Sequence, residues 1–390
     1  MSEYELVLHG DVWDAVNGLR PDRWVAVDGG DVQGVFEREP ESAETVHEVA
    51  FLTPGLVDMH VHLVWDGSDD PVATLREQSL PETVVEATRN ARAELAGGVT
   101  TVRDLGSTDD VAVTVASAIA EGKIPGPRTV ASGRTIIISG GHDPFWGIHS
   151  DGEDAVRSAV RTLRSRGADL IKVSATGGVY GQAVGEKPGA SELSLAELEA
   201  IVDEAGRFGL QVAAHAVGRE GIRNAVEAGV DTVEHGNLMD AETLSLVEER
   251  DVALDPTLFT YRNIATNDAV PAYARANAQT VYERHGEVFE EALERDVRVL
   301  AGSDAGSPEL PHPSLHRELE CMVELGQDPE DALASATSRA AAQLDRPELG
   351  VVEPGTPADL VGFAGDPRAD ISRVESPPLV VKGGVTYRSP

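Results

Sequence analysis

The chain has 390 residues, of which 41% are hydrophobic and 39 are glycine, a composition typical of an ordered globular protein with one large domain and a smaller unit. The 67 acidic residues outnumber the 32 basic ones and give a net charge of −35, so we expect neither nucleic acids nor anionic membranes as partners. The single cysteine, Cys321, excludes an internal disulfide and a thiolate metal cluster.

The sequence has no signal-peptide pattern and no apolar run as long as a membrane span, so we expect a cytoplasmic protein. The basic residues are four lysines and 28 arginines, and the acidic excess is spread along the chain. This pattern is typical of proteins adapted to molar salt, where the Debye length falls to about 3 Å and self-repulsion is screened. We therefore hypothesise a halophilic protein, with an ordinary acidic protein as the alternative.

The predicted elements begin with strands at residues 3–9 and 24–36, where apolar residues alternate with polar ones. From about residue 51, short apolar runs alternate with helical stretches, which is typical of repeated βα units. Eight strands are predicted along this part of the chain, at residues 48–60, 98–106, 127–133, 168–175, 210–216, 231–236, 252–258 and 297–306.

Helices are predicted between these strands. Residues 194–209 begin with a capping box, in which Glu197 follows Ser194 by three positions. A second helix, 219–231, is expected to stop at Gly229, and a last one is predicted over residues 328–344.

Eight strands with intervening helices predict a (β/α)₈ TIM barrel, an α/β fold, with a doubly wound open sheet as the structural alternative. Strand patterns return at 350–363 and 378–388. We expect these strands to pair with the N-terminal ones in a small composite β-sandwich domain formed by both chain ends. The predicted domains are residues 1–54 and 349–390 for the sandwich and 55–348 for the barrel.

Metal-binding side chains occur late in the predicted strands, where the active sites of such barrels lie. His60 and His62 follow the first strand, and the period of two in a strand places both on one side. His215, His235 and Asp304 end the fifth, sixth and eighth strands. Each of them alone could be an ordinary loop residue, but their common position at strand ends predicts a divalent metal site.

Lys172 lies within the apolar fourth strand, in "DLIKVSA". A buried ammonium without a partner costs several kcal/mol, on the order of the desolvation of a single ion. After reaction with CO₂ the same amine becomes a carbamate, an anion that can bridge two metal ions. A lysine whose stem is buried and whose charged end reaches an aspartate or solvent is the alternative.

Several stretches resemble the amidohydrolase superfamily, specifically its binuclear-metal branch with a carboxylated lysine on the fourth strand. Within it, the sequence is similar to the Xaa-Pro dipeptidase and imidazolonepropionase-related group. The matching stretches are "TPGLVDMHVHL" (53–63), "GVTTVRDLG" (98–106), "SGGHD" (139–143), "IKVSATGGV" (171–179), "AAHAVGREGIRNAVEAGVDTVEHG" (213–236), "GSDAG" (302–306), "ALASATSRAAAQL" (332–344) and "GVVEPGTPADLVGF" (350–363).

The resemblance implies that His60, His62 and Asp304 hold one metal ion and that His215 and His235 hold a second. Carboxylated Lys172 and a hydroxide would bridge the two ions. Zn²⁺ is the default ion for these ligands, and Mn²⁺ or Co²⁺ would suit them too. The implied activity is that of a hydrolase acting on a carbon–nitrogen bond, in which the bridging hydroxide attacks the carbonyl. Asp304 and Lys172 are thus the predicted catalytic residues, with Asp304 moving the proton to the leaving nitrogen.

The predicted substrate is a small molecule with an amide bond, such as a dipeptide, an N-acyl amino acid or a cyclic amide. His142 matches a family position near the substrate, and Tyr180 and His312 follow the fourth and eighth strands within expected reach of it. Val217 stands where many dipeptidase relatives have a tyrosine, a departure that argues against Xaa-Pro dipeptidase activity.

Two other functions are compatible with parts of this pattern. A mononuclear deaminase of the same superfamily would share the histidines and the aspartate but would lack the strand-four lysine. A non-catalytic barrel that only binds a ligand would have lost some of the six expected metal ligands, none of which is missing. Association into a homo-oligomer is a further expectation, because relatives often associate.

Overall fold

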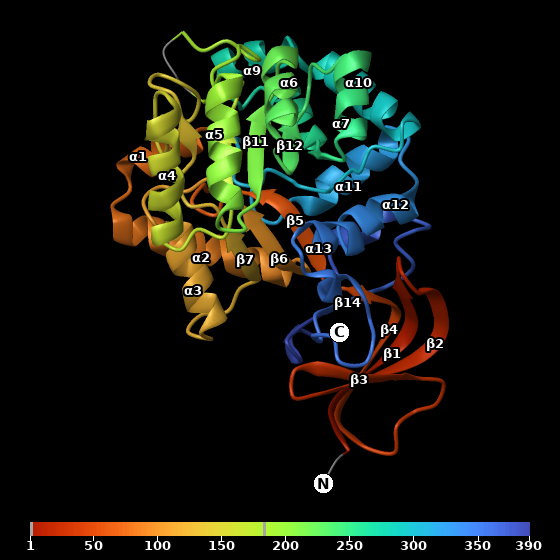
Figure 1. The fold of residues 1–390 in the computed structure, drawn as a ribbon. Coiled ribbons are helices and arrows are strands. Elements are labelled where there is room, and N and C mark those ends of the chain that lie inside the picture. Colours follow the sequence, from red (N-terminus) through yellow and green to blue (C-terminus); the bar gives the residue numbers. More distant parts are fainter. Residues whose placement is uncertain (1–2, 182–184) are drawn as a thin grey trace.

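The computed structural model describes residues 3–181 and 185–390. A helix-covered barrel occupies one end of the molecule and a strongly bent β-sheet the other, and both chain ends lie with that sheet (Figure 1). No helix among the described residues is both long and apolar enough to cross a membrane.

The small domain is a seven-stranded sheet that combines the two ends of the chain. Its order is β16-β15-β14-β4-β1-β2-β3. The strands are β1 (Tyr4–Asp14), β2 (Gly18–Asp28), β3 (Asp31–Phe36), β4 (Ala43–Pro54), β14 (Leu360–Phe363), β15 (Leu379–Lys382) and β16 (Val385–Arg388).

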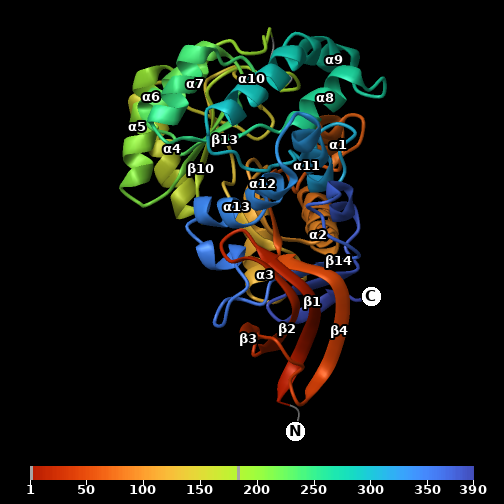
Figure 2. The ribbon, with the colours of Figure 1, turned by 90° about the vertical axis from the view of Figure 1, so that its right-hand side faces the viewer.

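The central pairing of this sheet joins the two chain ends: β14 runs antiparallel to β4, and β4 runs parallel to β1. Their shared core includes Leu8, Val25 and Leu52 from the N-terminal part with Leu360 and Val381 from the C-terminal part. Burial of this core requires both ends, because neither set of strands covers its apolar face alone. The composite β-domain predicted from the sequence is confirmed (Figure 2).

The barrel strands follow one another in chain order and form two parallel ladders, one of the first three strands and one of the last four. They are β5 (Leu56–Val61), β6 (Val99–Asp104), β7 (Arg128–Ala131), β10 (Ile171–Ser174), β11 (Val212–Ala216), β12 (Thr232–His235) and β13 (Ala253–Asp255). Two short strands, β8 (Ile136–Ile137) and β9 (Ile148–His149), follow β7, and β8 continues the barrel by pairing with β10.

The eighth predicted strand closes the barrel without forming a regular ladder. Val299 bridges to Leu254 of β13, and Ala305 bridges to Val61 of β5. The Met59 amide also donates to the Ala301 carbonyl at 3.0 Å. The first and last strands are therefore neighbours, which confirms the TIM barrel and excludes the open sheet.

The prediction of one strand over residues 48–60 is wrong, because the structure divides this stretch between the two domains at Gly55. Strand β4 ends at Pro54 in the small domain, and β5 begins at Leu56 in the barrel. A side chain at position 55 would lie 2.0 Å from Oγ1 of Thr100. Glycine is thus required where the chain leaves one sheet and enters the other against the wall of β6.

The helices surround the barrel. They are α1 (Pro71–Glu77), α2 (Leu80–Ala96), α3 (Val111–Ala120), α4 (Glu153–Ser165), α5 (Leu195–Gly206), α6 (Arg219–Ala228), α7 (Ala241–Glu249), α8 (Leu258–Thr266), α9 (Ala272–Gln279), α10 (Tyr282–Glu294), α11 (Leu315–Glu324), α12 (Pro329–Ser335) and α13 (Ser338–Gln343), with 3₁₀ turns η1 (Pro347–Gly350) and η2 (Ile371–Glu375).

The predicted helix ends are largely confirmed. Ser194 and Glu197 form the expected capping box at the start of α5, and α6 stops at Gly229, whose φ of +91° favours glycine. The prediction of one helix over residues 328–344 is wrong in one respect. The chain breaks it into α12 and α13 at Ala336 and Thr337, where the Thr337 backbone (φ −136°, ψ −97°) is not helical.

Candidate metal centre

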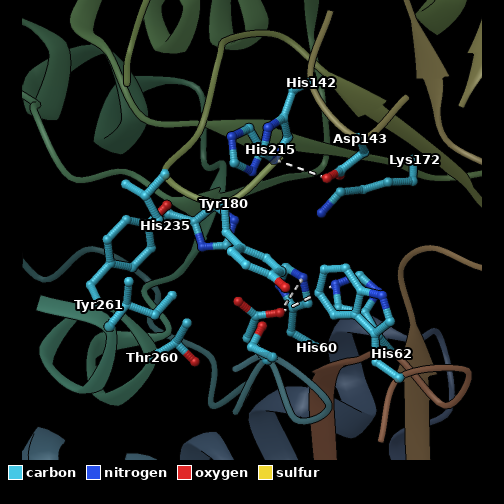
Figure 3. Close-up of a pocket in the computed structure, with 15 residues that line it drawn as sticks. His60, His62, His142, Asp143, Lys172, Tyr180, His215, His235, Thr260 and Tyr261 are labelled. Carbon is cyan, nitrogen blue, oxygen red and sulfur yellow. Dashed lines mark ion pairs between the residues drawn. The ribbon is translucent and has the colours of Figure 1, made fainter. Parts of the chain in front are cut away.

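The six predicted ligands converge in one cavity at the carboxyl ends of the barrel strands. His60 belongs to β5 and His62 follows it, Lys172 lies in β10, and His215 and His235 lie at the ends of β11 and β12. Asp304 lies between the Val299 and Ala305 bridges. All six side chains line this cavity, and Figure 3 shows the labelled histidines and Lys172 directed into it. The repeated βα arrangement brings them together because parallel strands end on the same side of the barrel.

His60, His62 and Asp304 have the geometry of one metal site. Oδ1 of Asp304 lies 3.2 Å from Nε2 of His62 and 3.7 Å from Nε2 of His60. Ligands bound to zinc at about 2.0–2.2 Å in a tetrahedral arrangement are about 3.3–3.6 Å apart. The three donors therefore fit a single divalent ion.

Hydrogen bonds from their other ring nitrogens orient both histidines. Nδ1 of His60 lies 3.0 Å from Oε2 of Glu234, and Nδ1 of His62 lies 3.1 Å from the Gly106 carbonyl. Both acceptors require the imidazole to donate, so the proton is on Nδ1 and the Nε2 lone pair faces Asp304. This arrangement, in which the second nitrogen is held by a carboxylate or carbonyl, is usual for metal-binding histidines.

The second group consists of His215, His235 and Lys172. The rings of His215 and His235 lie with centroids 4.7 Å apart. Nε2 of His215 is buried and has no hydrogen-bond partner in the described part of the chain, while Nδ1 of His235 lies 2.7 Å from Oγ1 of Thr257. An unpaired buried nitrogen is costly unless it binds something, so this group fits a second cation.

Lys172 lies in this group with only 2% of its surface exposed. It forms no ion pair with any residue that the structure describes. The alternative of a lysine paired with an aspartate is therefore not found in this arrangement. Burial lowers the pKa of the Lys172 ammonium, which favours the neutral amine, the form that reacts with CO₂.

The protonation states suit metal binding. Burial, with nearby cationic groups, lowers the pKa of His60, His215 and His235 well below 6.5, so all three are neutral at pH 7. Burial alone would raise the pKa of Asp304, but His60 and His62 bring it below 3.8. At neutral pH the site thus presents imidazole lone pairs and an ionised carboxylate.

Below the histidines lies a buried charged network that the sequence interpretation missed. Nη2 of Arg103 lies 2.9 Å from Oε1 of Glu234 and 3.3 Å from Oδ2 of Asp255, and all three side chains are at most 1% exposed. His60, Glu234 and Asp255 are close enough to hold a metal ion. However, Arg103 already pairs with Glu234, and burial next to Glu234 raises the pKa of Asp255 well above its usual range. The sequence does contain a signal for this network, because Arg103 and Glu234 lie inside otherwise apolar predicted strands. Buried charged side chains of this kind require partners.

His142 and Tyr180 both line the cavity. The His142 ring stacks on His215 with centroids 4.1 Å apart, and its nitrogens contact Asp143 and Glu186. Burial lowers the pKa of His142, but these carboxylates outweigh it and raise the pKa to about 9.

Tyr180 presents its ring to the cavity and not its hydroxyl. The hydroxyl donates to Asp70 at 2.6 Å, and the Val72 amide lies 3.5 Å from the same oxygen. The Tyr180 hydroxyl is therefore already engaged, and the role of Tyr180 in substrate binding stays a prediction.

His312 is not among the described residues that line the cavity. The substrate contact expected for it is therefore not found. Its side chain is fully buried, with Nδ1 2.6 Å from Glu94 and Nε2 3.3 Å from the His62 carbonyl. It lies behind His62 and supports the loop that carries it. Val217 is also fully buried, and its side chain packs in the hydrophobic core.

Fold and site together define a metal-binding barrel protein, and comparisons with known proteins give its family. The family model described as "Amidohydrolase family" matches residues 51–386. Ochratoxinase from Aspergillus niger is 29% identical over 385 residues, covering 90% of this chain and 78% of that protein.

Two further relatives extend this similarity. Imidazolonepropionase from Alkaliphilus oremlandii (strain OhILAs) is 23% identical over 374 residues, covering 90% of this chain and 84% of that protein. A crystal structure of a Xaa-Pro dipeptidase with bound methionine in the active site has a TM-score of 0.91 and 30% identity, covering 98% of this chain and 100% of that one.

The chain belongs to the amidohydrolase family. The resemblance to the Xaa-Pro dipeptidase and imidazolonepropionase-related group is also confirmed. The protein is accordingly a hydrolase of carbon–nitrogen bonds. Members of this family typically bind divalent metal ions, which agrees with the ligand groups described above.

Proposed function

We propose that this protein hydrolyses a carbon–nitrogen bond in a small amide through a binuclear metal centre. The main supporting observation is Lys172, a buried amine with no ion pair among the described residues, adjacent to two groups of metal-binding side chains. A mononuclear site would leave this amine without a use. Dipeptides, N-acyl amino acids and cyclic amides are the substrate classes to be screened.

In this proposal His60, His62 and Asp304 hold one ion, His215 and His235 hold the other, and N-carboxylated Lys172 is shared by both. Zn²⁺ is the ion best suited to these ligands, and Mn²⁺ or Co²⁺ would also fit. When bound, such ions lower the pKa of a water molecule towards 7 and polarise a substrate carbonyl.

Asp304 is the proposed proton carrier. Its carboxylate is ionised because His60 and His62 lower its pKa, and it borders the cavity where a water molecule would attack. It accepts the proton of that water and delivers it to the leaving nitrogen, which converts a poor leaving group into a neutral amine. His142 stacks on His215, and in this proposal it would contact the bound substrate.

The test is elemental analysis and turnover of a Lys172→Ala variant, with Lys123→Ala as the matched control because Lys123 is exposed and pairs only with Glu121 at the surface. We expect about two ions per chain in the wild type and the control. The Lys172 variant should lose metal and at least about 1,000-fold in kcat, because it lacks the shared ligand.

The alternatives give different results in the same experiment. A mononuclear deaminase would hold one ion, release ammonia and tolerate loss of Lys172, and a binding protein would hydrolyse no amide in the screen. Carboxylation itself is tested by a crystal structure of the metal-loaded enzyme. An unmodified lysine whose nitrogen contacts only protein or solvent would contradict the proposed centre.

A further inference from the structure

Aromatic residues are scarce in this chain and concentrate at the metal centre. The sequence contains only 7 Phe, 4 Trp and 6 Tyr. Six of these rings form one connected cluster beside the ligands, through contacts with the ligands and with one another: Trp65, Phe145, Trp146, Tyr180, Tyr261 and Tyr273. Such a concentration is not needed for metal binding.

The wall of the cavity beyond the ligands is largely apolar, although Asp143, Thr260 and Ser307 also line it. Trp65, Tyr180 and Tyr261 line it together with Val179 and Ile264. The ring of Trp65 lies 5.9 Å from that of Tyr180 in an edge-to-face arrangement. Because the Tyr180 hydroxyl is used by Asp70, the tyrosine adds ring surface to this wall and not a hydrogen bond to a substrate.

Among the described residues, this wall offers no cation that is not already paired with a carboxylate or assigned to the metal centre. Lys172 is the only lysine or arginine among the described residues that line the cavity, and the proposed centre uses it as a metal ligand. The nearby Arg103 is held by Glu234 and Asp255 beneath the histidines.

His142 cannot replace the missing cation. Its Nε2 lies 3.2 Å from Oδ1 of Asp143, and its Nδ1 contacts Oε1 of Glu186. Both nitrogens therefore face carboxylates already. A substrate carboxylate brought here would meet two anions before it met the imidazole, an unfavourable approach in a partly desolvated site.

An ionised carboxylate bound against the aromatic wall would lose much of its hydration without gaining a counter-charge, which is unfavourable. An uncharged aromatic or branched aliphatic group would instead gain contact with the rings. The cavity thus distinguishes amides by the charge and apolar surface of the group that extends from the metal centre.

We propose that the substrate is an amide whose substituent beyond the scissile bond is uncharged and aromatic or bulky aliphatic, and not a dipeptide or N-acyl amino acid with a free carboxylate. This proposal rests on the proposed function and narrows it. It attributes substrate selectivity to the aromatic wall. The enzyme should therefore prefer the uncharged member of two substrates that differ only in a carboxylate.

The test uses matched pairs on the metal-loaded wild-type enzyme in about 2 M NaCl, where surface charge is screened. N-acetyl-2-phenylethylamine is compared with N-acetyl-L-phenylalanine, and N-acetylpyrrolidine with N-acetyl-L-proline. We expect kcat/KM to be at least about tenfold higher for the uncharged member of each pair, because the carboxylate has no counter-charge. Equal or faster hydrolysis of the carboxylates would overturn the proposal.

A binding measurement separates this proposal from the proposed function. Phenylacetohydroxamic acid and its 4-carboxylate derivative carry the same metal-binding group and differ only in the charge directed at the wall. We expect the uncharged probe to bind at least about tenfold more tightly by calorimetry. Equal affinities would overturn the selectivity, whereas absence of all turnover by a metal-loaded enzyme would count against the proposed function alone.

A substitution of Ile264 should change the preference for uncharged substrates over carboxylates. It lines the cavity from α8, and Ile264→Lys would add a cation to the wall, with Ile264→Met as the uncharged control of similar length. The lysine variant should shift the ratio of kcat/KM values at least about tenfold towards the carboxylate substrate. An unchanged ratio in a folded, metal-loaded lysine variant would contradict the proposal, and if that variant does not fold, the wild-type pairs still decide.

Discussion

At the scale of single residues, the metal centre depends on side chains that never reach the cavity. Glu234 holds Nδ1 of His60 at 3.0 Å and is itself held by Nη2 of Arg103 at 2.9 Å. The carboxylate thereby selects the tautomer of His60 and directs its other nitrogen to the metal site. It also supplies a counter-charge for a guanidinium that has almost no contact with solvent.

Glu234→Gln should therefore weaken both metal binding and folding. We expect a roughly 10–100-fold loss of metal affinity, because the amide is a poorer acceptor for His60. The free energy of unfolding should also fall by about 3–5 kcal/mol, because the buried Arg103 loses the anion nearest to it. Chelator competition and denaturant unfolding in high salt measure the two effects.

Glu242→Gln is the control for this variant. Glu242 is 78% exposed and pairs with Arg223 at the surface, so its loss should change the free energy of unfolding by no more than about 0.5 kcal/mol. Equal metal affinity in the two variants would show that Glu234 does not position His60.

At the scale of elements, the junction between the two sheets determines how the barrel is attached. Strand β4 ends at Pro54 and β5 starts at Leu56, and the Gly55 amide donates to the Asp359 carbonyl at 2.8 Å. One residue therefore connects the small domain to the strand that carries His60. The sequence pattern showed a continuous apolar run here, because a buried strand of either sheet has the same composition.

Gly55→Ala should destabilise the protein because the added methyl group meets Oγ1 of Thr100 at 2.0 Å. Thr100 is itself buried, so it has little room to move. We expect the free energy of unfolding to fall by about 1–3 kcal/mol, the usual cost of overpacking.

Gly206→Ala is the matched control, since position 206 is helical and has no atom within 4 Å of an added side chain. It should leave the free energy of unfolding unchanged or raise it by up to about 1 kcal/mol, because alanine favours the helix. Denaturant unfolding of both variants in high salt is the measurement. A similar loss of stability in both would contradict the steric explanation.

At the scale of the whole molecule, the net charge of −35 acts on every element at once. Most of the acidic side chains are at the surface, and the chain has fewer than half as many basic residues to balance them. In dilute buffer, repulsion among these carboxylates opposes the compact state, and at about 1 M salt it is largely screened. We propose on this basis that the protein requires salt.

The melting temperature should consequently rise by at least about 10 °C between 0.1 and 2 M NaCl, because screening removes repulsion from the folded state. Sucrose at equal osmotic strength is the control. It favours compact states through exclusion from the surface but does not screen charge. A melting temperature that does not depend on NaCl, or that sucrose raises equally, would refute the salt requirement.

The sequence by itself determined the order of βα units, the pairing of both chain ends and the candidate ligands at the strand ends. These features follow from local periodicity and from the rule that parallel strands end on one side of a barrel. The placement of His142 and Tyr180 beside the cavity could also be predicted from the sequence.

Only the tertiary structure decided which groups hold the ligands in place and what surrounds them. The pairing of Arg103 with Glu234, the position of His312 behind His62 and the gathering of scarce aromatic rings join residues far apart in sequence. Such contacts depend on side-chain conformation and close packing, which no local pattern encodes. A barrel can be recognised from its strands, but its selectivity depends on the side chains that packing brings to their ends.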